Sequence, residues 1–136
     1  MHGLILAKQN ISTSIQWYNG TNTTTGATSN IVGSGNSNTN TIVSNQGTGN
    51  YAAKICSDLV LNGYSDWYLP SKDELNKLYL NRVAIGGFTT TAGFSNYWSS
   101  TQFDFNYPAY QQAFESGTQN GSEKNAYHRV RAVRSF

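Results

Sequence analysis

The chain has 136 residues and a formal net charge of +2, with 38% hydrophobic and 12% charged residues. This length suits one domain spanning residues 1–136 rather than two, and the charge is too small to indicate a nucleic-acid partner. No apolar stretch approaches the roughly 20 residues of a membrane span, so we expect no membrane insertion.

The first third of the chain predicts two short strands and then a long uncharged tract. Leu4–Ala7 and Ile15–Tyr18 have strand-like composition on either side of a polar turn at Gln9–Thr13. No charged residue occurs between positions 9 and 53. Although residues 20–50 have the Asn-, Thr-, Gly- and Ser-rich composition of a linker, spaced apolar residues predict an ordered, loop-rich region. These anchors are Trp17, Tyr18, Ile31, Val32, Ile42, Val43 and Tyr51.

Two short helices are predicted in the middle of the chain, and a third before them. The third covers Asn38–Gln46 and ends at Gly47. Tyr51–Leu61 has apolar residues at helical spacing, with Gly63 where a helix C-cap is expected. Further on, Ser71-Lys72-Asp73-Glu74 has the pattern of a capping box and predicts the start of another helix, whose buried stripe is Leu75, Leu78 and Tyr79.

The last third of the chain predicts strands separated by Gly, Asn and Ser. The strand candidates are Asn96–Ser100, Ala109–Glu115 and Arg129–Phe136. Small antiparallel sheets with helices grouped in the chain make the predicted class α+β. Because both ends are apolar strand candidates in a small domain, we expect Gly3–Ala7 and Val130–Phe136 to lie in one antiparallel sheet.

The sequence offers no catalytic motif. Cys56 is the only cysteine, so it can form no intramolecular disulfide, and its apolar neighbours predict a buried thiol. A nucleophile elbow, a zinc-protease helix motif and a phosphate loop are all missing from the sequence. We therefore expect a protein that is not an enzyme and needs no cofactor or metal.

Three motifs resemble a bacterial family, the DUF1566 or Legionella-collagen-like C-terminal domain. They are the segment 64–75 (YSDWYLPSKDEL), Tyr97–Thr101 (YWSST) and Val130–Arg134 (VRAVR). The resemblance implies a C-type-lectin-like fold of the formylglycine-generating-enzyme subtype. It also implies a ligand-binding role on bacterial adhesins, surface lipoproteins or phage tails, outside the cell. Members usually carry another strand before the segment matching His2–Ile5, so the chain is expected to lack an edge strand or to be cut from a longer protein.

The stretch from Trp98 to the C-terminus is similar to the variable region of proteins diversified by retroelements that mutate template adenines. In such regions, Asn codons can become Phe, Tyr, Asp, Pro, Ser, Gly, Thr, His, Arg or Ala codons, but not Gln, Lys, Glu or Trp codons. The resemblance implies a variable ligand-binding region over about residues 102–129. Its candidate ligand-binding residues are Phe103, Asp104, Phe105, Asn106, Tyr107, Ala113, Ser116, Thr118, Asn120, Gly121, Ser122, Asn125, Ala126, Tyr127 and His128.

The interleaved residues fit a constant framework: Gln112, Phe114, Gly117, Gln119 and Lys124. Since only exposed positions tolerate wholesale replacement, we expect the variable side chains to gather on one exposed face. Glu115 and Glu123 depart from the pattern, because an Asn codon cannot become a Glu codon in this way.

Several alternatives remain. The aromatic residues of 103–110 would be core if this run were a buried strand, although Pro108 disfavours a central strand. A fixed glycan-binding adhesin would use Lys124, Tyr127 and Arg129 for an acidic or sulfated sugar. A degenerate oxidase or a trimerising stalk cap are further rivals. The expected partner is an unidentified protein or glycan on a cell surface, and an oligomer is compatible with the sequence.

Overall fold

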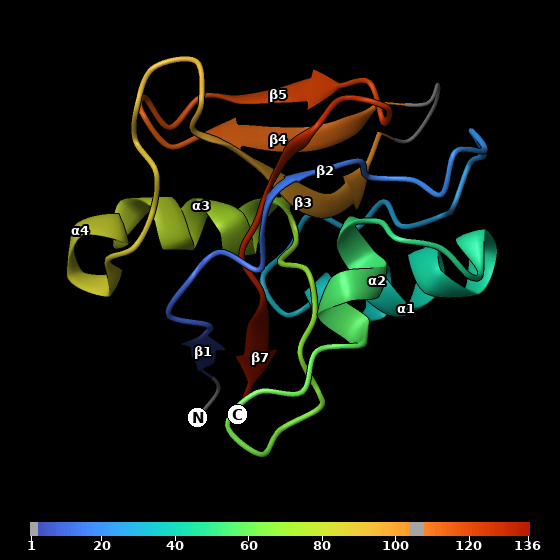
Figure 1. Cartoon of the computed structure of the whole chain (residues 1–136), viewed down its shortest axis with the longest axis horizontal. Helices are drawn as coiled ribbons and strands as arrows, with labels where there is room; N and C mark the ends of the chain where they lie inside the picture. Colours follow the sequence, from blue (N-terminus) through green and yellow to red (C-terminus); the bar gives the residue numbers. More distant parts are fainter. Residues whose placement is uncertain (1–2, 104–107) are drawn as a thin grey trace.

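The computed structural model describes residues 3–103 and 108–136 and divides them between two β-sheets and four short helices (Figure 1). The larger sheet has the strand order β2-β6-β3-β4-β5, and the smaller one pairs β1 with β7. Helix α3 lies between the two sheets, while α1 and α2 lie beside them. The class is therefore α+β, as predicted. The strands are β1 (Leu4–Leu6), β2 (Ser12–Ile15), β3 (Asn96–Gln102), β4 (Ala109–Ala113), β5 (Gln119–Ser122), β6 (His128–Val130) and β7 (Val133–Ser135); the helices are α1 (Gly35–Gln46), α2 (Ala52–Ser57), α3 (Lys72–Leu80) and α4 (Arg82–Ile85).

The two ends of the chain pair with each other, as predicted. β1 and β7 are antiparallel, with Leu4 opposite Ser135 and Leu6 opposite Val133. Beyond the strands, Gly3 N–H donates to the Phe136 carbonyl at 3.2 Å. The pairing brings both ends to the side of the molecule opposite β5 (Figure 1).

The predicted strand over 129–136 is wrong, because the segment passes from one sheet to the other. β6 belongs to the larger sheet and β7 to the smaller one. Between them, the Ala132 carbonyl accepts from Ala7 N–H at 3.1 Å. Arg131 is fully buried and its Nη1 donates to the Ala7 carbonyl at 3.0 Å, which holds this crossing in place.

The three tryptophans are core residues. Trp17, Trp67 and Trp98 are 0%, 3% and 0% exposed. The indole nitrogens of Trp17 and Trp98 donate to backbone carbonyls, of Ser99 and Ile15 respectively, each at 2.8 Å. These bonds satisfy the polar end of each buried ring and fasten β2 to β3.

Helix α3 begins at the predicted capping box. The Ser71 hydroxyl accepts from Glu74 N–H at 3.4 Å, and the Glu74 carboxylate accepts from Ser71 N–H at 2.9 Å. The same carboxylate also accepts from Gly35 N–H at 3.0 Å and from Gly33 N–H at 3.1 Å. One buried side chain therefore connects the start of α3 to the start of α1, which explains why α1 begins at Gly35 rather than at the predicted Asn38.

Other parts of the prediction also differ from the structure. The second strand is Ser12–Ile15 rather than 15–18, because Trp17 turns into the core. Helix α2 ends at Ser57, and Gly63 (φ 81°) lies instead in a turn between the bridged residues 61 and 64. Helix α4 was not predicted. Ile31 and Val32 are 64% and 45% exposed, so they are not core anchors. No helix of the described residues is long and apolar enough to cross a membrane.

Candidate functional site

The predicted variable region forms the edge of the larger sheet that lies farthest from the chain ends (Figure 1). It comprises β4, the turn over residues 114–118, β5, and the loop over 123–127 that leads into β6. Strands β4 and β5 are antiparallel, with Gln111 opposite Asn120 and Ala109 opposite Ser122. This local pairing places the candidate residues on a rigid strand pair and its connecting loops.

Phe114 anchors this edge in the core. The ring is fully buried and lies 4.6 Å from the Tyr97 ring and 5.5 Å from the Tyr79 ring, measured between centroids. Gly117, three residues later, has φ 85°, and a Cβ there would lie 2.5 Å from the Tyr79 ring. Both backbone conformation and space therefore require glycine at this position.

Two glutamines fasten the strand pair to α3. Gln112 is fully buried, and its amide nitrogen donates to Asn76 Oδ1 at 2.9 Å and to the Gly117 carbonyl at 3.0 Å. Gln119 Nε2 donates to the Lys72 carbonyl at 2.8 Å and to Gln112 Oε1 at 3.2 Å. These residues hold the backbone in position, as predicted for the framework.

Lys124 is also a structural residue. Its burial removes it from the set of residues that the glycan-binding alternative assigned to sugar binding. It is 2% exposed, and its ammonium group donates to the Thr23 carbonyl at 2.7 Å and to Gln102 Oε1 at 3.0 Å. Burial lowers the pKa of this lysine to about 8. The ammonium group lies 4.7 Å from the centre of the Trp17 ring, so it points into the core and cannot reach an external sugar.

The candidate residues on the same segments lie at or near the surface. The exposed Ser116, Thr118 and Asn120 alternate with the half-buried Gly117 and Gln119 along the chain. Ser116, Thr118, Asn120, Gly121, Asn125 and Tyr127 are exposed, whereas Phe103, Ala113, Ser122, Ala126 and His128 are half-buried. Asp104, Phe105, Asn106 and Tyr107 lie outside the described residues.

The candidates occupy two faces of the strand pair, which contradicts the prediction of one face. Successive residues of a strand point to opposite sides. Asn120 and Ser122 therefore share one face with Gln111, whereas Gly121 lies opposite Tyr110 on the other face. The Phe103 ring belongs to this second face, since its centroid is 4.3 Å from that of Tyr110 and a Cβ on Gly121 would lie 2.5 Å from it.

His128 has partners that the sequence did not indicate. Its Nε2 lies 2.9 Å from the Ser122 hydroxyl, and its ring packs edge-on against Trp98 with 4.5 Å between centroids. Burial lowers the pKa of the imidazole to about 4, so the ring is neutral at pH 7. A neutral ring held in this way braces the end of β5 against β6.

A small hollow opens beside this histidine. Its volume is about 250 Å³, and two exposed aromatic side chains flank it, Phe94 (68% exposed) and Tyr127 (63% exposed). Arg129 lines it as well and donates from Nε to the Phe94 carbonyl at 2.6 Å. The remaining lining residues are Thr13, Ser14, Gly93, Asn96 and His128.

Sequence reasoning missed five of the eight residues that line this hollow. Phe94 sits three residues before the buried Tyr97 and has the apolar character of a core residue. Thr13 and Ser14 belong to β2, which joins β6 antiparallel, with Ser12 opposite Val130. No local signal in the sequence connects residues 13–14 with residue 127, so only the sheet order could have found them.

The other candidate features are structural. Arg134 forms a bidentate pair with the Asp66 carboxylate at 2.6 and 3.0 Å, which gives it a structural role. Cys56 is fully buried, and burial raises the pKa of its thiol. Within residues 3–103 and 108–136, no group of three His, Cys, Asp or Glu side chains is placed to hold a metal ion.

Comparison with known proteins gives one family. The family model described as the Lcl C-terminal domain matches residues 8–134, nearly the whole chain. The match includes all three motifs on which the resemblance rests. The comparison with curated proteins found no match.

Proposed function

Because the chain belongs to the Lcl C-terminal domain family, we propose that it is a non-catalytic ligand-binding domain that displays a diversified surface. The surface consists of the turn over 114–118, β5 and the loop over 123–127. A retroelement that mutates template adenines would supply the diversity. Such a domain would act outside the cell, on a bacterial surface or a phage tail.

The observation that carries this proposal is the contrast in burial between the framework residues and the candidate residues between them. Gln112, Phe114 and Lys124 are at most 2% exposed, and two of these types, Gln and Lys, cannot arise from a mutated Asn codon. Between them, the small polar residues that such codons can produce are exposed, among them Ser116 and Asn120. A fold tolerates exchange only where a side chain does not pack the core, because core truncations cost about 2–5 kcal/mol.

The fold we propose is C-type-lectin-like, of the formylglycine-generating-enzyme subtype. The pairing of β1 with β7 supports it, since this pairing brings the two ends of the chain together. The long loops before α1 and between α4 and β3 also support it. In this fold the variable surface would be carried by the sheet far from the chain ends, as β5 is in Figure 1.

Binding would rest on shape and hydrogen bonding without any chemical step. Tyr127 and Phe94 offer large, rigid contact areas with few rotatable bonds, and Asn and Ser side chains beside them donate and accept hydrogen bonds. Antibody loops use the same combination of Tyr, Ser, Gly and Asn. An exposed aromatic pair around a hollow is typical of an interaction surface.

Two matched display libraries test the proposal. One randomises six surface positions with adenine-mutagenised codons: Ser116, Thr118, Asn120, Ser122, Asn125 and Tyr127. The control randomises the framework positions Gln112, Phe114, Gly117, Gln119 and Lys124. We expect protease-resistant folding in most members of the first library and few of the second, and binders against unrelated protein targets only from the first. Equal losses of folding in both libraries would contradict the proposal.

The second candidate function is that of a fixed glycan-binding adhesin. The hollow favours a form of this candidate that uses Tyr127 and Arg129 without Lys124. Tyr127 and Arg129 line the hollow together, so a sugar could stack on the ring and accept from the guanidinium group. Lys124 is excluded from that role because its ammonium group points into the core. A glycan array separates the two proposals. If the protein bound one specific sugar and the Arg129→Gln variant lost that binding, the adhesin would be favoured.

A further inference from the structure

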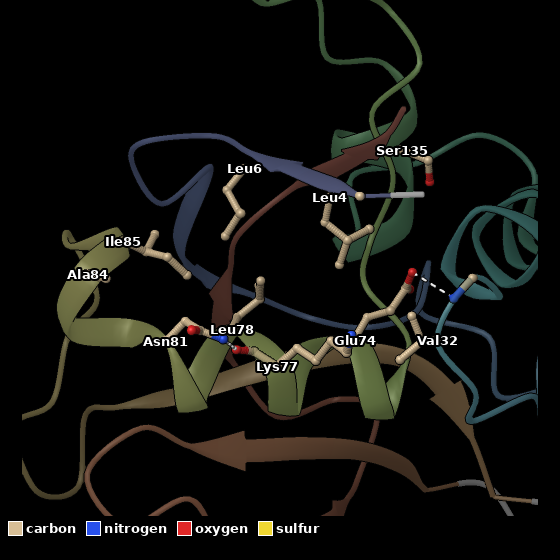
Figure 2. A pocket seen from close by; sticks show the side chains of 12 residues that line it. Leu4, Leu6, Val32, Glu74, Lys77, Leu78, Asn81, Ala84, Ile85 and Ser135 are labelled. Carbon is tan, nitrogen blue, oxygen red and sulfur yellow. Dashed lines mark hydrogen bonds between the residues drawn. The ribbon is translucent and has the colours of Figure 1, made fainter. Parts of the chain in front are cut away.

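A second hollow lies on the other side of the molecule from the variable surface, between β1, α3 and α4 (Figure 2). Its volume is about 680 Å³. Pockets for small molecules span roughly 300–1,000 Å³ and are lined mainly by apolar side chains with a few polar groups. The size alone therefore suits one small molecule.

The walls of this hollow are aliphatic. Leu4 and Leu6 come from β1, Leu78 from α3, and Ile85 from α4, and their side chains point toward the same space in Figure 2. Leu78 is 2% exposed and forms the floor, whereas the other three are half-buried. Because the apolar side chains of the lining are aliphatic and no aromatic ring is among the lining residues, a flexible hydrocarbon fits better than a flat ring system.

The two charged residues of the lining differ in whether their charged groups already have hydrogen-bond partners. The Glu74 carboxylate already accepts hydrogen bonds from the N–H groups of Ser71, Gly33 and Gly35 at 2.9–3.1 Å. Lys77, one turn along α3, is exposed, and within the described part of the chain its ammonium group has no hydrogen bond or ion pair. The charge left to meet an occupant is therefore positive.

We propose that this hollow binds one unbranched aliphatic carboxylate of medium length, with its chain among Leu4, Leu6, Leu78 and Ile85 and its carboxylate at Lys77. Burial of the chain removes apolar surface from water on both partners. The carboxylate end stays at the rim, where Lys77 is exposed. This site is separate from the variable surface, so its ligand and the displayed ligand bind independently.

Chain length provides the first test. Isothermal titration with hexanoate, octanoate and decanoate should show the affinity rising about fourfold for each added methylene until the hollow is filled. A comparison of octanoate with the uncharged octan-1-ol then tests the contribution of the carboxylate charge to binding. Lys77→Met should weaken octanoate binding by about two- to fivefold, the worth of an exposed ion pair, and leave octan-1-ol binding unchanged.

Two variants on the same helix test the location. Ala84 lines the hollow and is exposed, so Ala84→Trp fills the space without disturbing the core. Val83 is 89% exposed and is not among the lining residues, so Val83→Trp adds the same ring on the outside. We expect a loss of decanoate binding of more than about tenfold for Ala84→Trp and no loss for Val83→Trp.

Three results would overturn the proposal. Affinity independent of chain length would show that the hollow takes no hydrocarbon chain. Equal effects of the two tryptophan variants would place any binding elsewhere. If Ala84→Trp turned a dimer into a monomer in analytical ultracentrifugation, a second copy of the chain would cover the groove. Binders selected on the variable surface would be unaffected in every case, so this proposal and the proposed function fail separately.

Discussion

Phe114→Ala should be among the most damaging single substitutions in the variable region, although Phe114 directly precedes the exposed residues Glu115 and Ser116. The ring is 0% exposed and its centroid lies 4.6 Å from those of Tyr97 and Phe88. Truncation of a buried phenylalanine costs about 3–5 kcal/mol. Since domains are stable by about 5–15 kcal/mol, the variant should lose a large part of its stability.

The matched control is Tyr127→Ala, which removes a ring of similar size from the surface. Tyr127 is 63% exposed, and surface substitutions of this kind usually change stability by less than about 0.5 kcal/mol. For a chain of this length, each kcal/mol shifts the melting temperature by about 3–5 °C. We therefore expect Phe114→Ala to lower the melting temperature by about 10–20 °C and Tyr127→Ala to leave it nearly unchanged.

Thermal melting followed by circular dichroism measures both variants, and urea unfolding checks that the m-value stays constant. If both variants melted alike, or Tyr127→Ala melted lower, burial would not separate framework from variable positions.

Three further predictions concern single residues. Ser71→Ala removes the helix cap and should cost about 0.5–2 kcal/mol in thermal melts; an unchanged melting temperature would mean that the capping box contributes nothing. Gly117→Ala should cost about 1–3 kcal/mol in urea unfolding, because a side chain is strained at φ 85° and meets the Tyr79 ring. The pKa of His128 is lowered from 6.5 to about 4 in the folded state, so the unfolded chain binds the proton first as the pH falls. Stability should therefore decrease from pH 6.5 to about 4, and His128→Gln should flatten that part of the profile; identical profiles would refute the assignment.

Local signals predicted the helix at Ser71 and the end of α1 at Gly47. Both depend on residues within one or two turns: the capping box of α3, and the glycine after Gln46 with φ 72°. The start of α1 could not be predicted, because it depends on Glu74, which is 39 residues away in the chain. The crossing at Arg131 likewise depends on a carbonyl at Ala7, 124 residues away.

For the candidate site, the residue types predicted which side chains are buried better than they predicted on which face each side chain lies. Between 112 and 127 the codon types separated exposed from structural positions only in part, because Phe114 can arise from an Asn codon and is buried, whereas Glu115 and Glu123 cannot and are exposed. The expected single face was wrong, because it ignored the alternation of a strand, which places the Asn120 side chain and the Phe103 ring on opposite faces. Phe94 was missed because its exposure results from the sheet order and not from its neighbours in the sequence.

The central claim is that this surface is diversified while its framework is constant, and the genes themselves test it most directly. Deep sequencing of this gene in the population that carries it would record which codons vary. We expect amino-acid changes at the variable positions, such as those of Ser116, Asn120 and Tyr127, and unchanged codons for Phe114 and Gly117. Changes spread evenly over the chain, or no changes at the surface positions, would contradict the claim.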